Sequence, residues 1–444
     1  MRGAVQTALR EARRVGDLNY RKLRYLLEAV EAGYLDRWAH ALERATSLPC
    51  VERAARLLAA HLLDGERSPR FLYGWLKHRV VHDSHVVTLS EVLRAADALL
   101  RTPARVFQVL LAFRNLPRSF GRTPEWLSPA QTVEWLRTER HHAPVYRISG
   151  GMLLRITAHD VWTAIDRASE RAQSIAARVA LGTKTELRIA DDVWVAGVPR
   201  RYSLRRSRRG LEVGALVREA KLFAAPETTP VNSALELLGA LDGDAPGPAV
   251  AAGWAAVETL LTAPGDDDRG LAGDRLALLV ACSFPRAELT MLAYEYAERA
   301  DDELALRLRA AGSNFERCSR LAEAIEAGQA VAFPAPSDHL ALLRMRACLA
   351  DPHALLNDVQ QHVRAALRRL YRHRNLVLHG GRINAVCLKA ALRGAAPLVG
   401  AGMDRIAHGW FDGRIEPLDL AARAALGLEL VGRPDGRHPT CLLD

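Results

Sequence analysis

The feature of this chain that most constrains its fold is a long segment near the C-terminal end that contains no helix breaker. From Ala354 to Leu378 the sequence has neither glycine nor proline, the two residues that interrupt a helix most strongly. This predicts one continuous helix. Gly380 and Gly381 follow, and we expect them to end the helix, because glycine accepts the left-handed conformation found at helix C-termini. His379 is therefore predicted to lie in the last, exposed turn.

Three polar side chains gather at this predicted helix end. Arg374 and Asn375 are adjacent, and His379 follows Asn375 by four residues, which puts the latter two on one helix face. An arginine can stabilise charge on phosphoryl oxygens, and a histidine can carry a proton near neutral pH. RNA supplies its own nucleophile, the ribose 2′-hydroxyl, so its cleavage needs alignment, proton transfer and charge stabilisation but no metal. The pattern therefore makes these residues candidates for catalysis on RNA.

A purely structural interpretation of the same residues stays open. An arginine and a histidine near a helix C-terminus also favour the negative pole of the helix dipole. The same spacing occurs again at Arg137 and His142, without the asparagine and the glycines. Because an arginine-rich chain produces this spacing by chance, we assign no site to the second pair.

The segment Leu370–Gly381 resembles the signature of HEPN-domain proteins. It is closest to the Apea-like branch, whose motif consists of a tyrosine, a basic residue, R-N-x3-H and then glycines. Two upstream segments, Gly253–Leu261 and Asp274–Val280, resemble the early helices of that domain. The resemblance covers roughly residues 230–430, with an insertion between Ala300 and Leu355 relative to a minimal four-helix version.

The resemblance implies a helical bundle that pairs two-fold, so that two motifs form one composite, metal-independent ribonuclease site. It implies that Arg374 and His379 are catalytic with Asn375 supporting, that RNA is the substrate, that no cofactor is needed and that the assembly is a homodimer. Proteins of this family commonly act as toxins or antiviral defence effectors, so the first 226 residues would bind a trigger or regulatory protein. Two alternatives remain: a non-catalytic HEPN module that binds RNA or scaffolds a complex, and a toxin silenced by a partner protein.

Other charged residues add to this expectation. Trp254 is expected in the core, and Glu258, four residues later, could face the motif and hold Arg374. Binding of an RNA backbone depends largely on charge. Three arginines that precede the motif on the same predicted helix are therefore expected to contact RNA: Arg364, Arg368 and Arg372. A second group of arginines is either a further RNA contact or a solvated hairpin: Arg200, Arg201, Arg205, Arg206, Arg208 and Arg209.

Motifs for other chemistries are weak or missing. A group of His78, His82, Asp83 and His85 has a spacing that can bind zinc, but no acidic residue stands where a general base would be needed, and no metal is predicted. The sequence contains no phosphate-binding loop, no dinucleotide-binding glycine motif and no G-x-S-x-G elbow. Nucleotide hydrolysis, dinucleotide redox chemistry and esterase chemistry are therefore disfavoured.

Composition also indicates which partners and which cellular location to expect. The net charge of +10 is carried almost wholly by arginine, with only five lysines, which reflects either a codon bias or phosphate binding. The six cysteines form no C-x-x-C pair, so we expect reduced thiols in a cytoplasmic protein. The N-terminal segment has no apolar stretch typical of a signal peptide, and no run of about 18 apolar residues predicts a membrane span.

The chain is predicted to be mostly α-helical, in three parts. Residues 1–140 form an N-terminal helical region, in which Val106–Leu116 is expected to be a helix, residues 141–226 a small α/β module, and residues 227–444 a HEPN-like all-α domain. Asp160 is expected to cap the long helix of the module. The predicted strands are Val145–Arg147, Leu153–Ile156, Glu186–Ile189, Val193–Ala196 and Tyr202–Leu204. The predicted C-terminal helices are Ser233–Leu241, Ala249–Leu261, Leu271–Ser283, Ala287–Ala311, Asn314–Ala327, Asp338–Leu349, Ala354–Leu378 and Ile383–Trp410.

Overall fold

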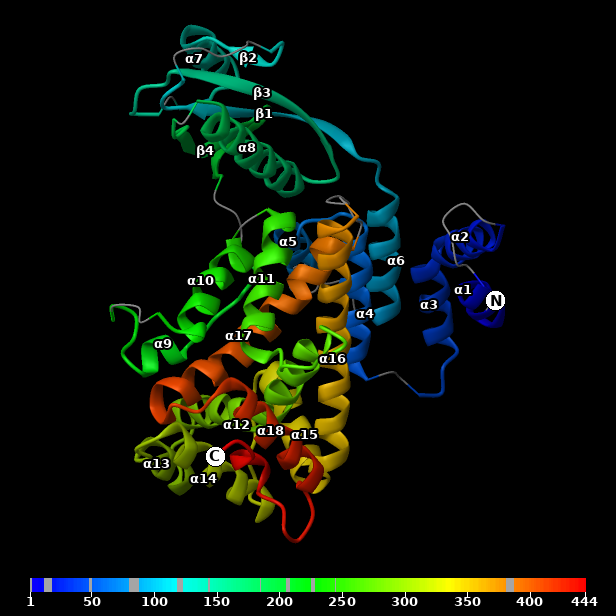
Figure 1. The fold of residues 1–444 in the computed structure, drawn as a ribbon. Helices are drawn as coiled ribbons and strands as arrows, with labels where there is room; N and C mark the ends of the chain where they lie inside the picture. The colour runs from blue at the N-terminus through cyan, green and yellow to red at the C-terminus, as the bar shows by residue number, and fades with distance from the viewer. Residues whose placement is uncertain are drawn as a thin grey trace. The chain divides into compact units, whose positions relative to one another are not determined.

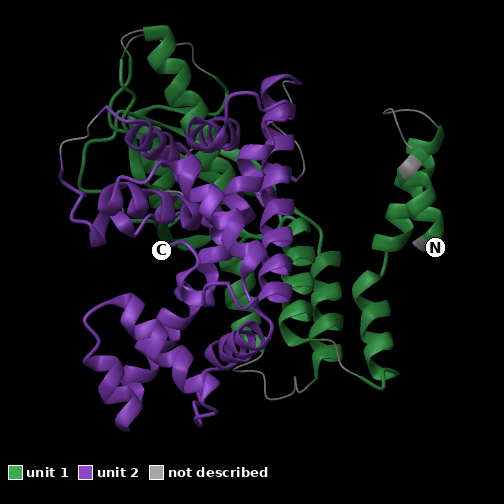
Figure 2. Ribbon diagram, turned by 60° about the horizontal axis from the view of Figure 1, so that its bottom comes forward, with its two compact units in different colours: residues 1–206 green, residues 207–444 purple. Residues whose placement is uncertain are grey.

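A computed structural model describes the greater part of the chain. The described residues are 2–11, 18–47, 50–79, 88–117, 123–142, 144–183, 185–204, 208–224, 228–243, 245–380 and 387–444. They form eighteen α-helices and one five-stranded sheet, so the prediction of a mostly helical protein is confirmed (Figure 1). The chain divides into two compact units, which we call unit 1 (Met1–Arg206) and unit 2 (Ser207–Asp444) (Figure 2).

The first half of unit 1 consists of short amphipathic helices. Leu35, Leu58 and Leu93, from three of these helices, share one apolar core. The prediction of a helical N-terminal region is confirmed for its described residues up to Arg101. The helices are α1 (Arg2–Glu11), α2 (Leu18–Glu31), α3 (Tyr34–Glu43), α4 (Val51–Asp64), α5 (Pro69–Lys77) and α6 (Leu89–Arg101).

The second half of unit 1 is an antiparallel sheet with a helix on each face. Its strands are β1 (Arg105–Phe113), β2 (Trp126–Leu127), β3 (Gly150–Ala158), β4 (Ile189–Val195) and β5 (Val198–Ser203), in the order β2-β3-β1-β4-β5. Helix α8 (Val161–Thr183) packs against one face of β1 through Ala164 and Ala168. Helix α7 (Pro129–Thr138) covers the other face through Leu136.

The prediction of a helix at Val106–Leu116 is wrong, because Arg105–Phe113 is the central strand of the sheet. Both faces of this strand are buried: Val109 and Leu111 face α8, whereas Leu110 lies in the α7 core. A strand covered on both sides lacks the alternation of apolar and polar residues that marks a half-exposed strand, and short apolar runs of this kind resemble buried helices.

The other strand predictions were partly correct. Val145–Arg147 forms no strand, and the strand expected at Glu186 begins only at Ile189. The strands predicted at 153–156, 193–196 and 202–204 overlap β3, β4 and β5. The predicted cap is confirmed, because the backbone N–H of Thr163 donates to Asp160 Oδ1 at 2.9 Å.

Unit 2 is all helical in its described part. Four of its helices, α11, α12, α16 and α17, each contact the other three and form a four-helix core. Helices α13 to α15 occupy the predicted insertion between Ala300 and Leu355. The bounds are α9 (Ala215–Arg218), α10 (Pro230–Gly243), α11 (Pro246–Leu261), α12 (Leu271–Arg299), α13 (Glu303–Arg309), α14 (Asn314–Glu326), α15 (Pro336–Ala350), α16 (Pro352–Leu378), α17 (Leu388–Gly413) and α18 (Pro417–Leu430). Helix α18 was not predicted separately, and the start expected for α17 at Ile383 lies outside the described residues.

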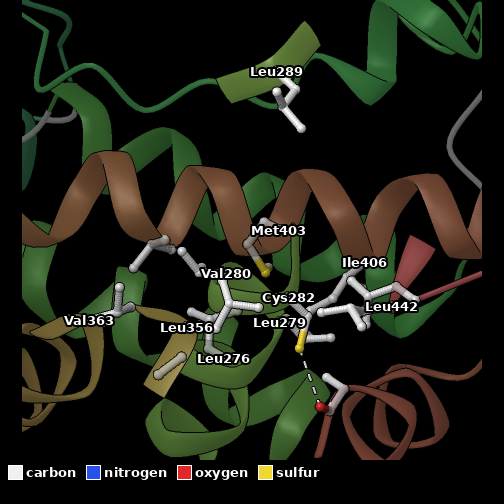
Figure 3. Packing of buried hydrophobic residues seen from close by; sticks show 14 of the residues in the cluster. Leu276, Leu279, Val280, Cys282, Leu289, Leu356, Val363, Met403, Ile406 and Leu442 are labelled. Carbon is white, nitrogen blue, oxygen red and sulfur yellow. Dashed lines mark hydrogen bonds between the residues drawn. The ribbon is translucent and has the colours of Figure 1, made fainter. Parts of the chain in front are cut away.

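The core of unit 2 is built around α12 (Figure 3). Leu276 and Val280 of α12 pack with side chains from α16 and α17, among them Val363 and Met403. The Cys282 thiol donates to the carbonyl of Ala424 at 3.3 Å, and burial raises the pKa of this thiol to about 12. The thiol is therefore protonated and structural rather than reactive.

Helix α12 also departs from the prediction at its centre. It runs unbroken from Leu271 to Arg299 through Pro285, where two helices were predicted. Pro285 is buried within the unit 2 core, so packing on both sides outweighs the loss of one backbone hydrogen bond. Within the described part of the chain, α12 is the one helix long and apolar enough to cross a membrane, and over half of its most apolar stretch is buried inside unit 2.

An aspartate before α12 makes the stability of unit 2 depend on pH. Hydrogen bonds from Arg275 and from the backbone of Ala263 lower the pKa of Asp266 to about 2. An unfolded aspartate titrates near ~3.9, so this stabilisation is complete above about pH 4 and is lost as the pH falls towards 2. We expect Asp266→Asn to lower the melting temperature at pH 7 and to differ progressively less from the parent protein as the pH falls. Thermal unfolding across pH measures this, and the exposed neighbour Asp267→Asn should show no such convergence.

Candidate active site

The candidate site lies at the C-terminal end of α16. The helix begins where the Asp351 side chain accepts a hydrogen bond from the backbone of Ala354 at 3.0 Å, with a proline in its first turn. Its apolar face is buried in the unit 2 core at Leu356, Val363 and Leu367. The helix ends at Leu378, as predicted, and His379 is its exposed C-cap residue.

The helix end is closed differently from the prediction. Gly380 does not adopt the left-handed conformation, and its N–H continues the helical pattern by bonding to the carbonyl of Leu376 at 3.1 Å. Glycine is nevertheless required for a steric reason, because a Cβ at this position would lie 2.7 Å from that carbonyl oxygen. Gly381, the second glycine of the motif, lies outside the described residues.

The structure brings all three candidate catalytic side chains together. The Nη1 atom of Arg374 lies 3.0 Å from Asn375 Oδ1 and 3.3 Å from His379 Nε2. A guanidinium group can only donate, so in this contact His379 Nε2 is the acceptor, and its lone pair is directed at the arginine. A general base would use this lone pair to accept a proton.

A carboxylate on the neighbouring helix α11 fixes the arginine from the other side. The Nη2 atom of Arg374 lies 3.6 Å from Glu258 Oε2, and both side chains are largely buried, with 18% and 15% of their surface exposed. One turn earlier, the fully buried ring of Trp254 packs against Tyr371 at 4.9 Å between ring centroids. The expectations for Glu258 and Trp254 are thus confirmed. The arginine is held by a buried carboxylate while its other edge reaches the exposed histidine.

Two of the three arginines expected to contact RNA are engaged within the protein. Arg368 binds Asp274 through two hydrogen bonds of 2.8 and 2.7 Å and also pairs with Asp268. Arg364 pairs with the same Asp274 at 2.9 Å. Burial alone would raise the pKa of Asp274, but the hydrogen bonds from the two arginines bring it below its usual value. Arg368 therefore links α16 to the start of α12, and a phosphate would have to displace two carboxylates to reach it.

Arg372 is the better placed of the three for an external anion. It is exposed and one turn from the site, and it makes no ion pair with any residue that the structure describes. The adjacent His373 is buried, and burial together with the charge of Arg372 lowers its pKa, which keeps the ring neutral. The sequence analysis did not single out His373, and its place on the buried face, three residues after Leu370, was the available signal.

Substitution of Arg368 and of Arg372 should show that the first contributes to stability and the second to RNA binding. Arg368→Ala removes the ion pair of Asp268 and leaves Asp274 with Arg364 alone, and it should lower the free energy of unfolding by about 1–2 kcal/mol, discounted for partial exposure of the pairs. Arg372→Ala should leave stability within about 0.5 kcal/mol of the parent, because the side chain is exposed. It should instead weaken RNA binding and reduce its salt dependence by about 0.7 in the logarithmic slope. Denaturant unfolding and RNA titrations at several salt concentrations measure both, and the reverse pattern would contradict these roles.

The remaining candidates are scattered. In the second arginine group, Arg201 pairs with Asp192 at 3.2 Å in unit 1, whereas Arg208 and Arg209 bind the end of α10 in unit 2, and Arg205 and Arg206 lie outside the described residues. The described members of this group are therefore divided between the two units. In the histidine group, His78 follows α5, and His82, Asp83 and His85 lie outside the described residues. The second arginine–histidine pair is not assembled like the first, because Arg137 pairs with Glu134 at 2.7 Å.

The geometry of unit 2 thus places a fixed cation, an amide and an imidazole in contact at one exposed helix end, with a largely buried carboxylate behind them. Such a site can bind a phosphate oxygen through the arginine and exchange a proton through the histidine. Compared with models of protein families, with curated proteins and with solved structures, the chain matches none.

Proposed function

We propose that this protein is a metal-independent endoribonuclease whose active site is formed by Arg374, Asn375 and His379 in a HEPN-like unit 2. The observation that carries the proposal is the 3.3 Å contact between Arg374 and His379, anchored by Glu258 at the exposed end of α16. A histidine that served only the helix dipole would need neither the amide nor the buried carboxylate. The four-helix core and the R-N-x3-H-G motif at the end of one core helix support the resemblance to HEPN proteins.

The reaction needs only groups that the site and RNA possess. His379 Nε2 accepts the proton of the ribose 2′-hydroxyl as the 2′-oxygen bonds to phosphorus. The bond from phosphorus to the 5′-oxygen then breaks, and that oxygen takes a proton from an acid, giving a 2′,3′-cyclic phosphate and a 5′-hydroxyl. Arg374 exchanges its contact with His379 for a phosphoryl oxygen, which frees the histidine lone pair and stabilises the developing charge.

A two-fold dimer would complete this chemistry. One copy offers one histidine at this helix end, whereas the reaction uses a base and an acid. A two-fold interface uses the same patch on both partners, so two α16 ends would meet at one axis and supply two histidines and two arginines. Activity per chain should then rise with protein concentration until the dimer is saturated.

The biological setting follows from the resemblance to the family. We propose a cytoplasmic defence effector or toxin, with unit 1 as the part that receives a trigger or a regulatory protein. Arg372 is the favoured phosphate contact beside the site, and Arg364 is the second, because it is half-exposed and makes a single ion pair.

The direct test is cleavage of mixed RNA by the pure full-length protein in EDTA. We expect products with 2′,3′-cyclic phosphate ends, detected by their resistance to phosphatase until they are opened with acid. Binding of RNA without cleavage at any protein concentration would favour a non-catalytic RNA-binding module instead. Cleavage that stops in EDTA and leaves 3′-hydroxyl ends would contradict the proposed chemistry.

A further inference from the structure

Unit 1 contains an open pocket that the proposed nuclease does not use. It has a volume of about 590 Å³ and lies between α5 and the first turn of α8, with Arg70, Trp75 and Trp162 in its wall. The two helices start side by side, because Asp160, which caps α8, also accepts a hydrogen bond from the backbone N–H of Ser68, the N-cap residue of α5, at 3.0 Å. The buried Asp160 thus fixes both walls, and the volume is in the range of small-ligand sites.

Two arginines contact one indole ring of the pocket wall: Arg70 lines the pocket itself, and Arg200 of β5 approaches the same ring. The guanidinium carbons of Arg70 and Arg200 lie 5.1 and 5.2 Å from the ring centre of Trp162. Arg200 also stacks on Tyr202 at 4.6 Å, and the Tyr202 ring meets the Trp162 ring edge-on at 4.9 Å. The cluster therefore combines two guanidinium groups with two aromatic rings that meet edge to face.

Neither Arg70 nor Arg200 makes an ion pair with a carboxylate among the residues that the structure describes. Their neighbours differ: Arg201 pairs with Asp192 at 3.2 Å, and Arg167 pairs with Glu66 at 2.7 Å. Two like charges on one ring, with no carboxylate paired to either in the described part of the chain, favour the binding of an anionic ligand.

The net charge also differs between the two units of the chain. Unit 1 has 34 lysines and arginines against 21 aspartates and glutamates, whereas unit 2 has 27 against 30. The positive excess therefore belongs to unit 1 and not to the unit with the candidate active site. An excess of this kind raises the local concentration of polyanions around unit 1.

We propose that this pocket binds a nucleotide, with its base stacked in the aromatic and guanidinium cluster and its phosphate held by Arg70 and Arg200. A base has a planar π-face that stacks on tryptophan or on a guanidinium plane, and a phosphate matches the fork of an arginine. A purely apolar ligand would leave the arginines unused, and a simple anion would leave the indoles of Trp75 and Trp162 unused. The nucleotide is either free or part of an RNA strand. The site is independent of the ribonuclease proposal.

The test measures nucleotide binding to the full-length protein by calorimetry and by fluorescence anisotropy. The probes are the four nucleoside monophosphates, inorganic phosphate, and a labelled 2′-O-methyl oligonucleotide of about ten nucleotides, which lacks the nucleophile for cleavage. Arg70→Ala, Arg200→Ala should weaken binding at least about tenfold, because both side chains are exposed and their removal should leave the fold intact. The matched control is Arg178→Ala, Arg188→Ala, which removes the same charge from exposed positions of unit 1 outside the pocket.

Each outcome bears on the proposal. Tight binding of a monophosphate identifies a free nucleotide, and binding of the oligonucleotide alone identifies a nucleotide within a strand, provided that only the pocket variant loses it. Equal losses in the pocket variant and the control would reduce the effect to overall charge and overturn the proposal. Inorganic phosphate that binds as tightly as the monophosphates would also overturn it, because the base would then contribute nothing.

Discussion

Replacing Arg374 and His379 together by alanine should reduce RNA cleavage by at least about 10³-fold. Removal of a general base costs about 10²–10⁴ in rate, and removal of a donor to a charged transition state costs about 10²–10³. The two losses should not multiply, because Arg374 and His379 contact each other and act on one phosphate. His379→Ala alone should therefore come close to the double variant. The measurement is the initial rate of cleavage at saturating protein, with the ends of the products identified.

A pair of substitutions elsewhere in the chain gives the matched control. Arg137→Ala, His142→Ala removes the same two residue types at the same spacing, from exposed positions of unit 1. It should leave the rate unchanged. Because Arg374→Ala leaves the largely buried Glu258 without its partner, Arg374→Lys serves as the second variant, which keeps the charge but loses the planar fork. Full activity in the variant that lacks both Arg374 and His379, with the fold intact by circular dichroism, would contradict the assignment of this site.

Local sequence patterns predicted the fold of unit 2 well. The absence of helix breakers between Ala354 and Leu378 predicted the first residue of α16 to within two positions and predicted its last residue correctly. Periodicity carries this information because each helix of the bundle buries one face. The pattern failed at Pro285, a buried residue that usually breaks helices, within a helix α12 that packs along its length against α16, α17 and α18. Such compensation depends on tertiary packing and has no local signal.

The central strand of unit 1 shows a second limit of pattern reading. The residues of β1 are apolar on both faces because α7 and α8 cover the sheet from both sides. The sequence of Arg105–Phe113 alone fits a buried helix as well as it fits a strand, because the strand is distinguished only by the two helices that cover it. Its two valines and two phenylalanines were the one available hint of a strand.

The candidate site was predictable only where its members are close in sequence. Arg374, Asn375 and His379 belong to one helix, so spacing alone brought them together. The ion pairs of Arg368 with Asp268 and Asp274 depend on how α12 packs against α16. These partners are about one hundred residues away from Arg368 in the sequence. The nucleotide pocket depends likewise on residues from three distant segments. A spacing rule cannot recognise contacts of this kind.

Glu258→Gln should lower kcat of RNA cleavage by about 10- to 100-fold while leaving KM unchanged or lower. The substitution keeps the shape of the side chain and removes its charge, so Arg374 loses the group that holds its Nη2 edge at 3.6 Å. The arginine keeps its own charge and can still bind a substrate phosphate, but it is no longer fixed in the orientation that the transition state needs. Glu258 is in this sense a positioning residue, since it contacts the arginine and not the reacting atoms. Steady-state kinetics over a range of RNA concentrations separate the two parameters.

A double-mutant cycle distinguishes positioning from a general structural role. If Glu258 acts through Arg374, Glu258→Gln should cost nothing further in the Arg374→Ala background, because the interaction is already gone. The pH dependence of kcat should also keep its form in Glu258→Gln, because His379 remains the group that exchanges the proton. A structural role would instead lower the melting temperature and reduce activity equally in both backgrounds. That second pattern would remove Glu258 from the site and leave Arg374 oriented only by Asn375 and His379.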